Sequence, residues 1–165
     1  MTVFIGTLFS DTADVTKTIR PIIDKIQQKH IFVPQRYLHV TLIYLGNEKE
    51  KKYISLTNLQ TLKYIKHKKC IFSHLDFIGT SLVFFFKFED CDINLMMDNL
   101  MKEQNNSIQA HITLGKIDIE CKQDFNANTK HKISELLENI NFNFNLIELI
   151  NVDKFKNYNS NRVIC

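Results

Sequence analysis

Two short segments of this 165-residue chain carry the same chemically useful side chains. Residues 39–42 read His-Val-Thr-Leu, and residues 111–114 read His-Ile-Thr-Leu. In a chain with six histidines, two His-x-Thr segments with an apolar middle residue and a following leucine arise by chance in fewer than about one case in a thousand. These segments are therefore the strongest chemical signal in the sequence.

Both segments lie in stretches typical of β-strands, over residues 37–45 and 110–117. Neighbouring side chains of a strand point to opposite faces, so the histidine and threonine of each segment share one face. The apolar residues between them then point to the core. Each strand is thus predicted to position an imidazole and a hydroxyl on a rigid element of the fold, as catalysis requires.

An imidazole pair suits general acid–base chemistry. The ordinary pKa of histidine is about 6.5, so near neutrality one ring can be neutral while the other is protonated. The neutral ring takes a proton from an attacking hydroxyl or water, and the protonated ring gives one to the leaving oxygen of a phosphodiester. The threonine hydroxyls can donate to the non-bridging phosphate oxygens. Because no carboxylate cluster accompanies the segments, we expect chemistry that needs neither a metal ion nor a cofactor.

Composition and charge narrow the class of protein. The length fits one domain over residues 1–165. A net charge of +3 is too small for a protein that binds a long nucleic-acid duplex. The four cysteines form no CxxC pair, which predicts neither a disulfide framework nor a zinc ribbon. No apolar run is long enough to span a bilayer, and the N-terminus lacks the layout of a signal peptide. We expect a monomeric, intracellular protein.

Strand and helix patterns intermingle along the whole chain, which predicts an α+β fold. Strands are expected over residues 3–9, 37–45, 70–78, 82–88, 110–117, 142–146 and 162–164. Helices are expected from Ser10 or Asp11 to residue 26, over 54–65 and 93–101, and from Asn128 or Thr129 to residue 140. Pro21 should kink or restart the first helix, and Gly79-Thr80 should form a hairpin turn.

The two segments, together with their flanks, resemble the motifs of the 2H phosphoesterases, also called LigT-like proteins. The matching stretches are residues 37–46, YLHVTLIYLG, and residues 111–116, HITLGK. The resemblance implies a bilobal fold, with two similar lobes of antiparallel sheet flanked by helices and a central groove between the motif strands. It also implies that His39 and His111 are the catalytic acid–base pair and that Thr41 and Thr113 bind phosphate. Which histidine is the base stays open.

The same resemblance implies a metal-independent phosphodiesterase that cleaves 2′-linked or cyclic nucleotides, such as 2′–5′ oligoadenylates or 2′,3′-cGAMP. A chain rich in Lys, Asn, Ile and Phe is typical of AT-rich genomes, viral ones among them. We therefore favour a hydrolase of nucleotide second messengers that would antagonise innate immune signalling from the host cytoplasm. One alternative is an RNA-end 2′,3′-cyclic phosphodiesterase or 2′–5′ RNA ligase, and another is a non-catalytic nucleotide-binding sponge. The expected partner is a small nucleotide or short oligonucleotide, with no membrane.

Three residues beside the motifs have two interpretations each. Tyr37 shares its face with His39, where it can stack on a base or pack in the core or at the rim. Arg36 precedes the first motif strand and either meets a phosphate or is solvated. Lys116 follows the second motif, but strict alternation points it away from His111, so it needs a β-bulge to reach a phosphate.

The remaining candidates are expected at solvated or structural positions. A basic cluster forms a solvated face or steers an anionic substrate; it consists of Lys63, Lys66, His67, Lys68 and Lys69. His67 and His74 have no partner at zinc-site spacing, so we expect both to be structural or surface residues. Helical spacing assigns three methionines to core packing: Met96, Met97 and Met101.

Overall fold

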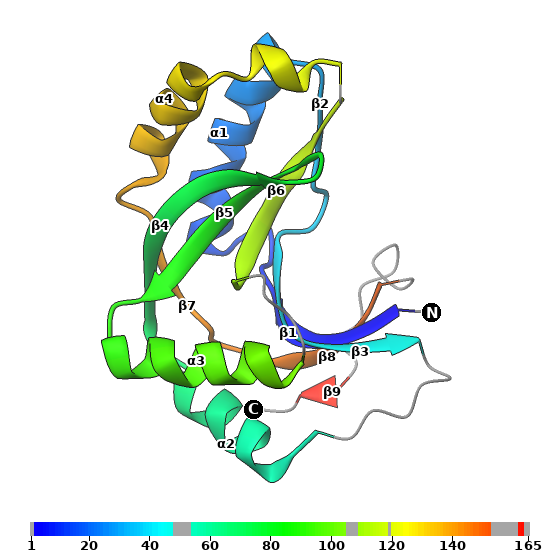
Figure 1. Cartoon of the computed structure of the whole chain (residues 1–165), viewed down its shortest axis with the longest axis vertical. Helices are drawn as coiled ribbons and strands as arrows, with labels where there is room; N and C mark the ends of the chain where they lie inside the picture. The colour runs from blue at the N-terminus through cyan, green and yellow to red at the C-terminus, as the bar shows by residue number, and fades with distance from the viewer. Residues whose placement is uncertain (1, 48–53, 105–108, 119, 153–161, 164–165) are drawn as a thin grey trace.

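The computed structural model describes residues 2–47, 54–104, 109–118, 120–152 and 162–163. This part of the chain forms helices on an antiparallel sheet (Figure 1), so the predicted α+β class is confirmed. The strands are β1 Thr2–Leu8, β2 Phe32–Pro34, β3 His39–Asn47, β4 Lys69–Ile78, β5 Ser81–Phe88, β6 His111–Ile117, β7 Asn141–Asn143, β8 Glu148–Asn151 and β9 Arg162–Val163. The helices are α1 Asp14–Lys29, α2 Leu56–Ile65, α3 Cys91–Glu103 and α4 Ala127–Leu137, with a short 3-10 turn at Lys122–Asp124.

The described strands join in one sheet of order β7-β4-β5-β6-β3-β1-β8-β9, with β2 paired to β6. A separate small sheet in each half, as the sequence led us to expect, is therefore not found. The motif strands β3 and β6 lie at the middle of this order. They meet through a single residue pair, Val40 opposite Ile112. The sheet is thus continuous but narrowly joined at the two motifs.

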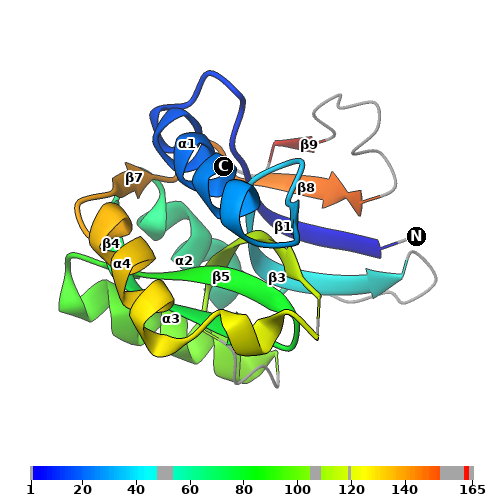
Figure 2. The same ribbon diagram turned by 90° about the horizontal axis from the view of Figure 1, so that it is seen from above.

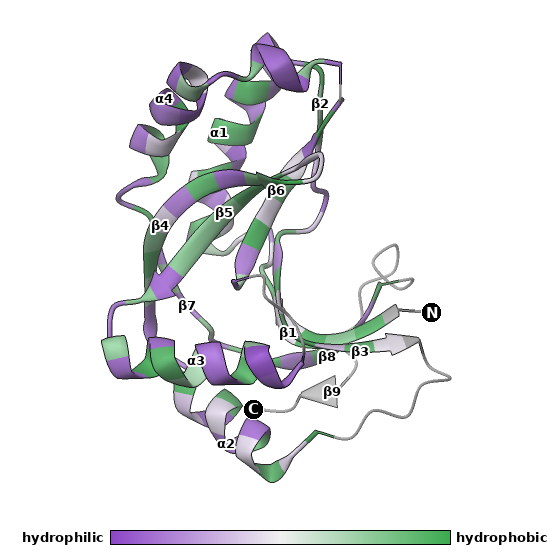
Figure 3. Ribbon diagram, viewed as in Figure 1, coloured by the Kyte–Doolittle hydropathy of each residue, from purple (hydrophilic) through white to green (hydrophobic). Residues whose placement is uncertain are grey.

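The helices lie in two pairs (Figures 1 and 2). Helices α1 and α4 pack together beside β4, while α2 and α3 pack together beneath β5. Hydrophobic residues alternate with hydrophilic ones along these helices (Figure 3), and their apolar sides bury against the sheet. Alternate residues of β5 supply the other side of that core, namely Leu82, Phe84, Phe86 and Phe88.

Helix α1 differs from its prediction in two respects. It runs without interruption through Pro21; the expected restart is wrong because one continuous face, including Ile19, Ile22 and Ile26, is buried and holds the helix together. The N-cap is Ala13, which makes no side-chain capping bond, rather than Ser10 or Asp11. The Ala13 amide instead donates to the Ser10 carbonyl at 3.1 Å.

Helix α4 begins earlier and ends earlier than predicted. Its N-cap is Asn126, whose Oδ1 accepts the amide of Thr129 at 2.9 Å. The chain leaves the helix after Leu137, and the carbonyl of Ile140 then accepts the Phe72 amide from β4. Pairing with the neighbouring strand therefore replaces the last helical turn. Strands β2 and β8 carry no local pattern strong enough for prediction.

The hairpin between β4 and β5 is confirmed. Gly79 has φ +60° in the two-residue turn, a conformation that glycine adopts without steric cost. Elsewhere, within the described residues, no helix combines the length and apolar character needed to cross a bilayer.

Candidate active site

The register of β3 and β6 brings the two motifs together. Val40 lies directly opposite Ile112, and both side chains are fully buried in the core. The histidine and threonine that flank each of them point to the other face of the sheet. Because the strands are antiparallel, Thr41 follows this pair on the side of His111 and His39 precedes it on the side of Thr113, although the paired register itself comprises the single pair. All four side chains are partly exposed there.

The two imidazoles are held in the same way. His39 Nδ1 lies 2.9 Å from the carbonyl oxygen of Tyr37, and His111 Nδ1 lies 2.9 Å from that of Gln109. A carbonyl only accepts hydrogen bonds, so each ring carries its proton on Nδ1. Proton transfer by either ring would therefore go through Nε2, and each ring is fixed by the residue two positions before it.

A phenylalanine contacts each histidine. The ring centroids of Phe4 and His39 are 5.3 Å apart, and those of Phe85 and His111 are 5.7 Å apart. Both phenylalanines are buried, yet neither belongs to the main core cluster. They form an apolar surface beneath the two histidines on the motif face of the sheet. The sequence alone did not indicate them, because their position depends on which strands pair.

The electrostatics of the two histidines differ. Burial lowers the pKa of His39 below its ordinary value of 6.5, and the charge of His111 lowers it further, while the hydrogen bond to the Tyr37 carbonyl opposes the shift. His39 therefore stays neutral at lower pH than an exposed histidine does. A neutral His39 is suited to accept a proton, and the mutual repulsion disfavours the state in which both rings are charged.

The segment that leads into β3 is fixed from helix α1. Arg20 donates to the carbonyl oxygens of Gln35 and Arg36. The Arg36 guanidinium carbon lies 5.1 Å from the centre of the Tyr37 ring. Arg36 is exposed and Tyr37 is partly buried. The structure thus shows that these two residues contact each other. Their expected contacts with a phosphate and a base stay predictions.

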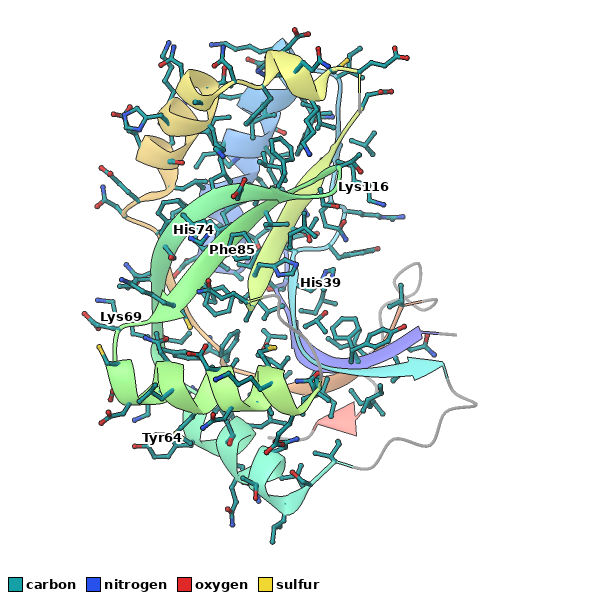
Figure 4. The ribbon with its side chains drawn as sticks, in the orientation of Figure 1. His39, Tyr64, Lys69, His74, Phe85 and Lys116 are labelled. Atoms are coloured by element: carbon teal, nitrogen blue, oxygen red, sulfur yellow. The ribbon has the colours of Figure 1, made fainter. Side chains whose placement is uncertain are left out.

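Lys116 has the β-bulge that its predicted role requires. Val83 of β5 pairs with Thr113, but Leu82 pairs with Gly115, so Leu114 is the extra residue. Ser81 then pairs with Lys116, which returns this lysine to the face that carries Thr113. Lys116 is exposed and lies near the end of β6, away from His111 at its start; Figure 4 shows it apart from His39.

Helix α3 supports β3 beyond the point where β3 and β6 meet. Gln104 accepts the amide of Tyr44 at 3.0 Å and donates to the carbonyl of Leu42 at 2.9 Å. One side chain thus takes the place of a neighbouring strand residue. It satisfies backbone groups of β3 just after Thr41 and keeps the first motif strand extended.

The basic cluster and the methionines of α3 lie away from this face. The basic cluster is at the turn between α2 and β4, and Figure 4 shows Lys69 and Tyr64 well apart from His39. Most of its members are exposed, which fits a solvated face. Met97 and Met101 are buried in the core, as predicted, whereas Met96 is only partly buried and does not belong to the core cluster.

Two cavities lie elsewhere in the fold. One of about 380 Å³ lies between β5 and α3, and another of about 360 Å³ lies between α1 and α4. Neither is lined by a motif histidine or threonine. Across the described ranges, no group of three or more His, Cys, Asp or Glu side chains is placed to hold a metal ion. The candidate site is therefore the motif face of the sheet, where the two imidazoles and two hydroxyls are partly exposed.

No protein-family model matches the chain, and no curated protein matches it significantly.

Proposed function

We propose that the protein is a phosphodiesterase that acts on nucleotides without a metal ion, with His39 as general base and His111 as general acid. The observation that carries this proposal is the side-by-side placement of two His-x-Thr segments, with each imidazole held through Nδ1. The lowered pKa of His39 supports its assignment as the base.

The proposed reaction follows from that placement. Nε2 of neutral His39 removes the proton of an attacking water or ribose hydroxyl as the new oxygen–phosphorus bond forms. Protonated His111 donates its Nε2 proton to the leaving oxygen as the old bond breaks. Thr41 and Thr113 donate hydrogen bonds to the non-bridging oxygens, where negative charge accumulates. A water nucleophile yields a phosphomonoester, whereas a neighbouring ribose hydroxyl yields a 2′,3′-cyclic phosphate.

The arrangement of strands supports the 2H phosphoesterase interpretation of the fold. Each motif strand belongs to its own part of the sheet: β6 to the part with β2, β4, β5 and β7, and β3 to the part with β1, β8 and β9. The single pair Val40–Ile112 joins them. We interpret these parts as the two similar lobes that the motifs predict.

The substrate we favour is a 2′–5′ oligoadenylate or a cyclic dinucleotide, as the motif resemblance implies. Two partly exposed imidazoles with a hydroxyl beside each suit the cleavage of a single phosphodiester that links two nucleosides. A second-messenger hydrolase of the host cytoplasm is the biological role that we infer from it. RNA-end processing and binding without turnover are the outcomes that would replace it.

A substrate panel in EDTA tests this function. It contains 2′–5′ triadenylate, 2′,3′-cGAMP, 3′,3′-cyclic dinucleotides, 2′,3′-cyclic AMP and a short RNA with a 2′,3′-cyclic end, with products identified by mass spectrometry. We expect rapid loss of one of the first three, with the same rate after added Mg²⁺ or Zn²⁺. Hydrolysis of only the 2′,3′-cyclic phosphates would indicate an RNA-end processing enzyme. Tight binding without turnover would indicate a protein that binds nucleotides without cleaving them. Activity that EDTA removes and a metal ion restores would contradict the metal-free mechanism.

The threonine hydroxyls give a second prediction. Thr41→Val or Thr113→Val keeps the side-chain shape but removes one donor to the phosphate, so kcat/KM should fall by about tenfold or more. Thr41→Ser keeps a hydroxyl and should retain most of the activity. Thr18→Val, on the exposed side of α1, is the matched control. Equal activity of Thr41→Val and the control in steady-state assays would remove Thr41 from the site.

A further inference from the structure

A third histidine lies in the same cross-strand row as His111. His74 of β4 pairs directly with Phe85 of β5, and Phe85 pairs directly with His111 of β6. Directly paired residues of antiparallel strands project from the same face. His74 therefore lies on the motif face, about 10 Å from His111 at the spacing of two strands.

A β-bulge places His74 on that face. Phe72 pairs with Phe86 and packs against the core, and the next pair is His74 with Phe85, so Ser73 is the extra residue. Without the bulge, strict alternation would point His74 into the core together with Phe72. The bulge at Ser73 and the bulge at Leu114 thus both redirect a basic side chain onto the motif face.

The His74 ring is a stacked and exposed platform. It lies 4.5 Å from the Phe85 ring at an interplanar angle of 15°, a parallel stack, while Phe85 in turn contacts His111. The Phe85 side of this stack is buried, with only 8% of the Phe85 surface accessible, whereas His74 is exposed. Figure 4 shows the two rings side by side on adjacent strands. One face of the imidazole is covered, which leaves the other for a flat ligand.

The charges beside His74 favour a base over a phosphate. Asp76 lies two residues along β4 and pairs with Val83, on the same face. Its Oδ1 accepts the amide of Phe77 at 2.8 Å and the ammonium of Lys130 at 3.2 Å, and these bonds hold the pKa of Asp76 below its ordinary value. The Asp76–Lys130 ion pair carries no net charge that would attract a phosphate, whereas its carboxylate can still accept a hydrogen bond from the amino group of a nucleobase.

We propose that His74, supported by Phe85, binds the nucleobase of the nucleoside that leaves from the His111 side of the site. This inference rests on the proposed function, because it takes His111 as the acid that protonates the leaving oxygen. The base stacks on the exposed face of the His74 ring, and an amino-bearing base such as adenine also reaches the carboxylate of Asp76.

Two substrates that differ only in the leaving group test the proposal. The first is 2′–5′ diadenylate, which releases adenosine, and the second is the methyl ester of adenosine 2′-phosphate, which releases methanol. His74→Ala should lower kcat/KM for the diadenylate by about tenfold, equivalent to about 1.4 kcal/mol. It should leave kcat/KM for the methyl ester unchanged. His74→Phe keeps an aromatic ring and should restore most of the loss.

Two further measurements separate this proposal from the proposed function. His131→Ala removes an exposed histidine of α4 that pairs with Glu135, so it serves as the matched control and should change neither rate. Equilibrium binding of the diadenylate is measured in His39→Ala and in the double variant His39→Ala/His74→Ala, where catalysis does not interfere. The double variant should bind about tenfold more weakly.

Each outcome decides between the two claims. Cleavage of both substrates with no effect of His74→Ala keeps the proposed function and overturns the base platform. Absence of cleavage, together with binding that weakens on loss of His74, keeps the platform and overturns the catalysis. Equal losses for both substrates overturn the platform, because they assign His74 a structural role. Absence of both cleavage and binding overturns both claims.

Discussion

Replacing His39 or His111 by alanine is expected to lower kcat for the preferred nucleotide by at least about 10²-fold. Each substitution removes the only nitrogen that we assign to one of the two proton transfers. Both Nδ1 atoms lie within hydrogen-bond distance of backbone carbonyls, so we assign each proton transfer to Nε2. Steady-state rates, with product identified by mass spectrometry, measure the effect.

The stability of the same variants has to be followed. His39 and His111 are only partly buried, so thermal unfolding midpoints should stay close to that of the wild type. His131→Ala again serves as the control for loss of an imidazole at an exposed position. If either motif variant keeps full activity while folded, the assignment of the acid–base pair is wrong.

Gly6→Ala is expected to damage both the fold and the site. A Cβ atom at Gly6 would lie 1.9 Å from the carbonyl oxygen of Val40 and 3.1 Å from a ring carbon of Phe4. The first contact is with backbone, so no side-chain rotation relieves it, and β1 and β3 must separate beside Thr41. Overpacking of this kind lowers the free energy of unfolding by about 1–3 kcal/mol. Because Phe4 and Val40 support the motif face, kcat/KM should also fall.

Urea unfolding and steady-state kinetics on the same preparations measure this effect. Gly79→Asn is the matched control: nothing lies within 4 Å of a Cβ there, and asparagine tolerates the positive φ of that turn. The control should lose little stability and no activity. A Gly6→Ala protein as stable and as active as the control would show that β1 does not constrain the site.

Alternation along single strands made the motif face predictable. His39 and Thr41 had to share a face because Val40 and Leu42 had to be buried, and the second motif follows the same rule. The hairpin at Gly79 was predictable for a similarly local reason. These features depend on residues close together in the sequence, which is where pattern arguments are strongest.

Features that depend on pairing between distant strands were not predictable. The bulge at Ser73 places His74 beside Phe85, although local alternation gave no reason to assign His74 to the site. Pro21 is the converse case, since its local preference is overridden by burial of the α1 face. The contact of Phe4 with His39 likewise exists only once β1 lies beside β3.

The central claim is that one imidazole acts neutral while the other acts protonated, and the pH dependence of kcat/KM tests it most directly. Activity should rise with pH as His39 loses its proton and fall at higher pH, where a catalyst that needs a protonated acid becomes inactive, which gives a bell. Burial lowers the pKa of His39, so the midpoint of the rising limb should lie below 6.5. The residual activity of His39→Ala should lack that limb. A monotonic profile in the wild type, or an unchanged rising limb in His39→Ala, would contradict the paired mechanism.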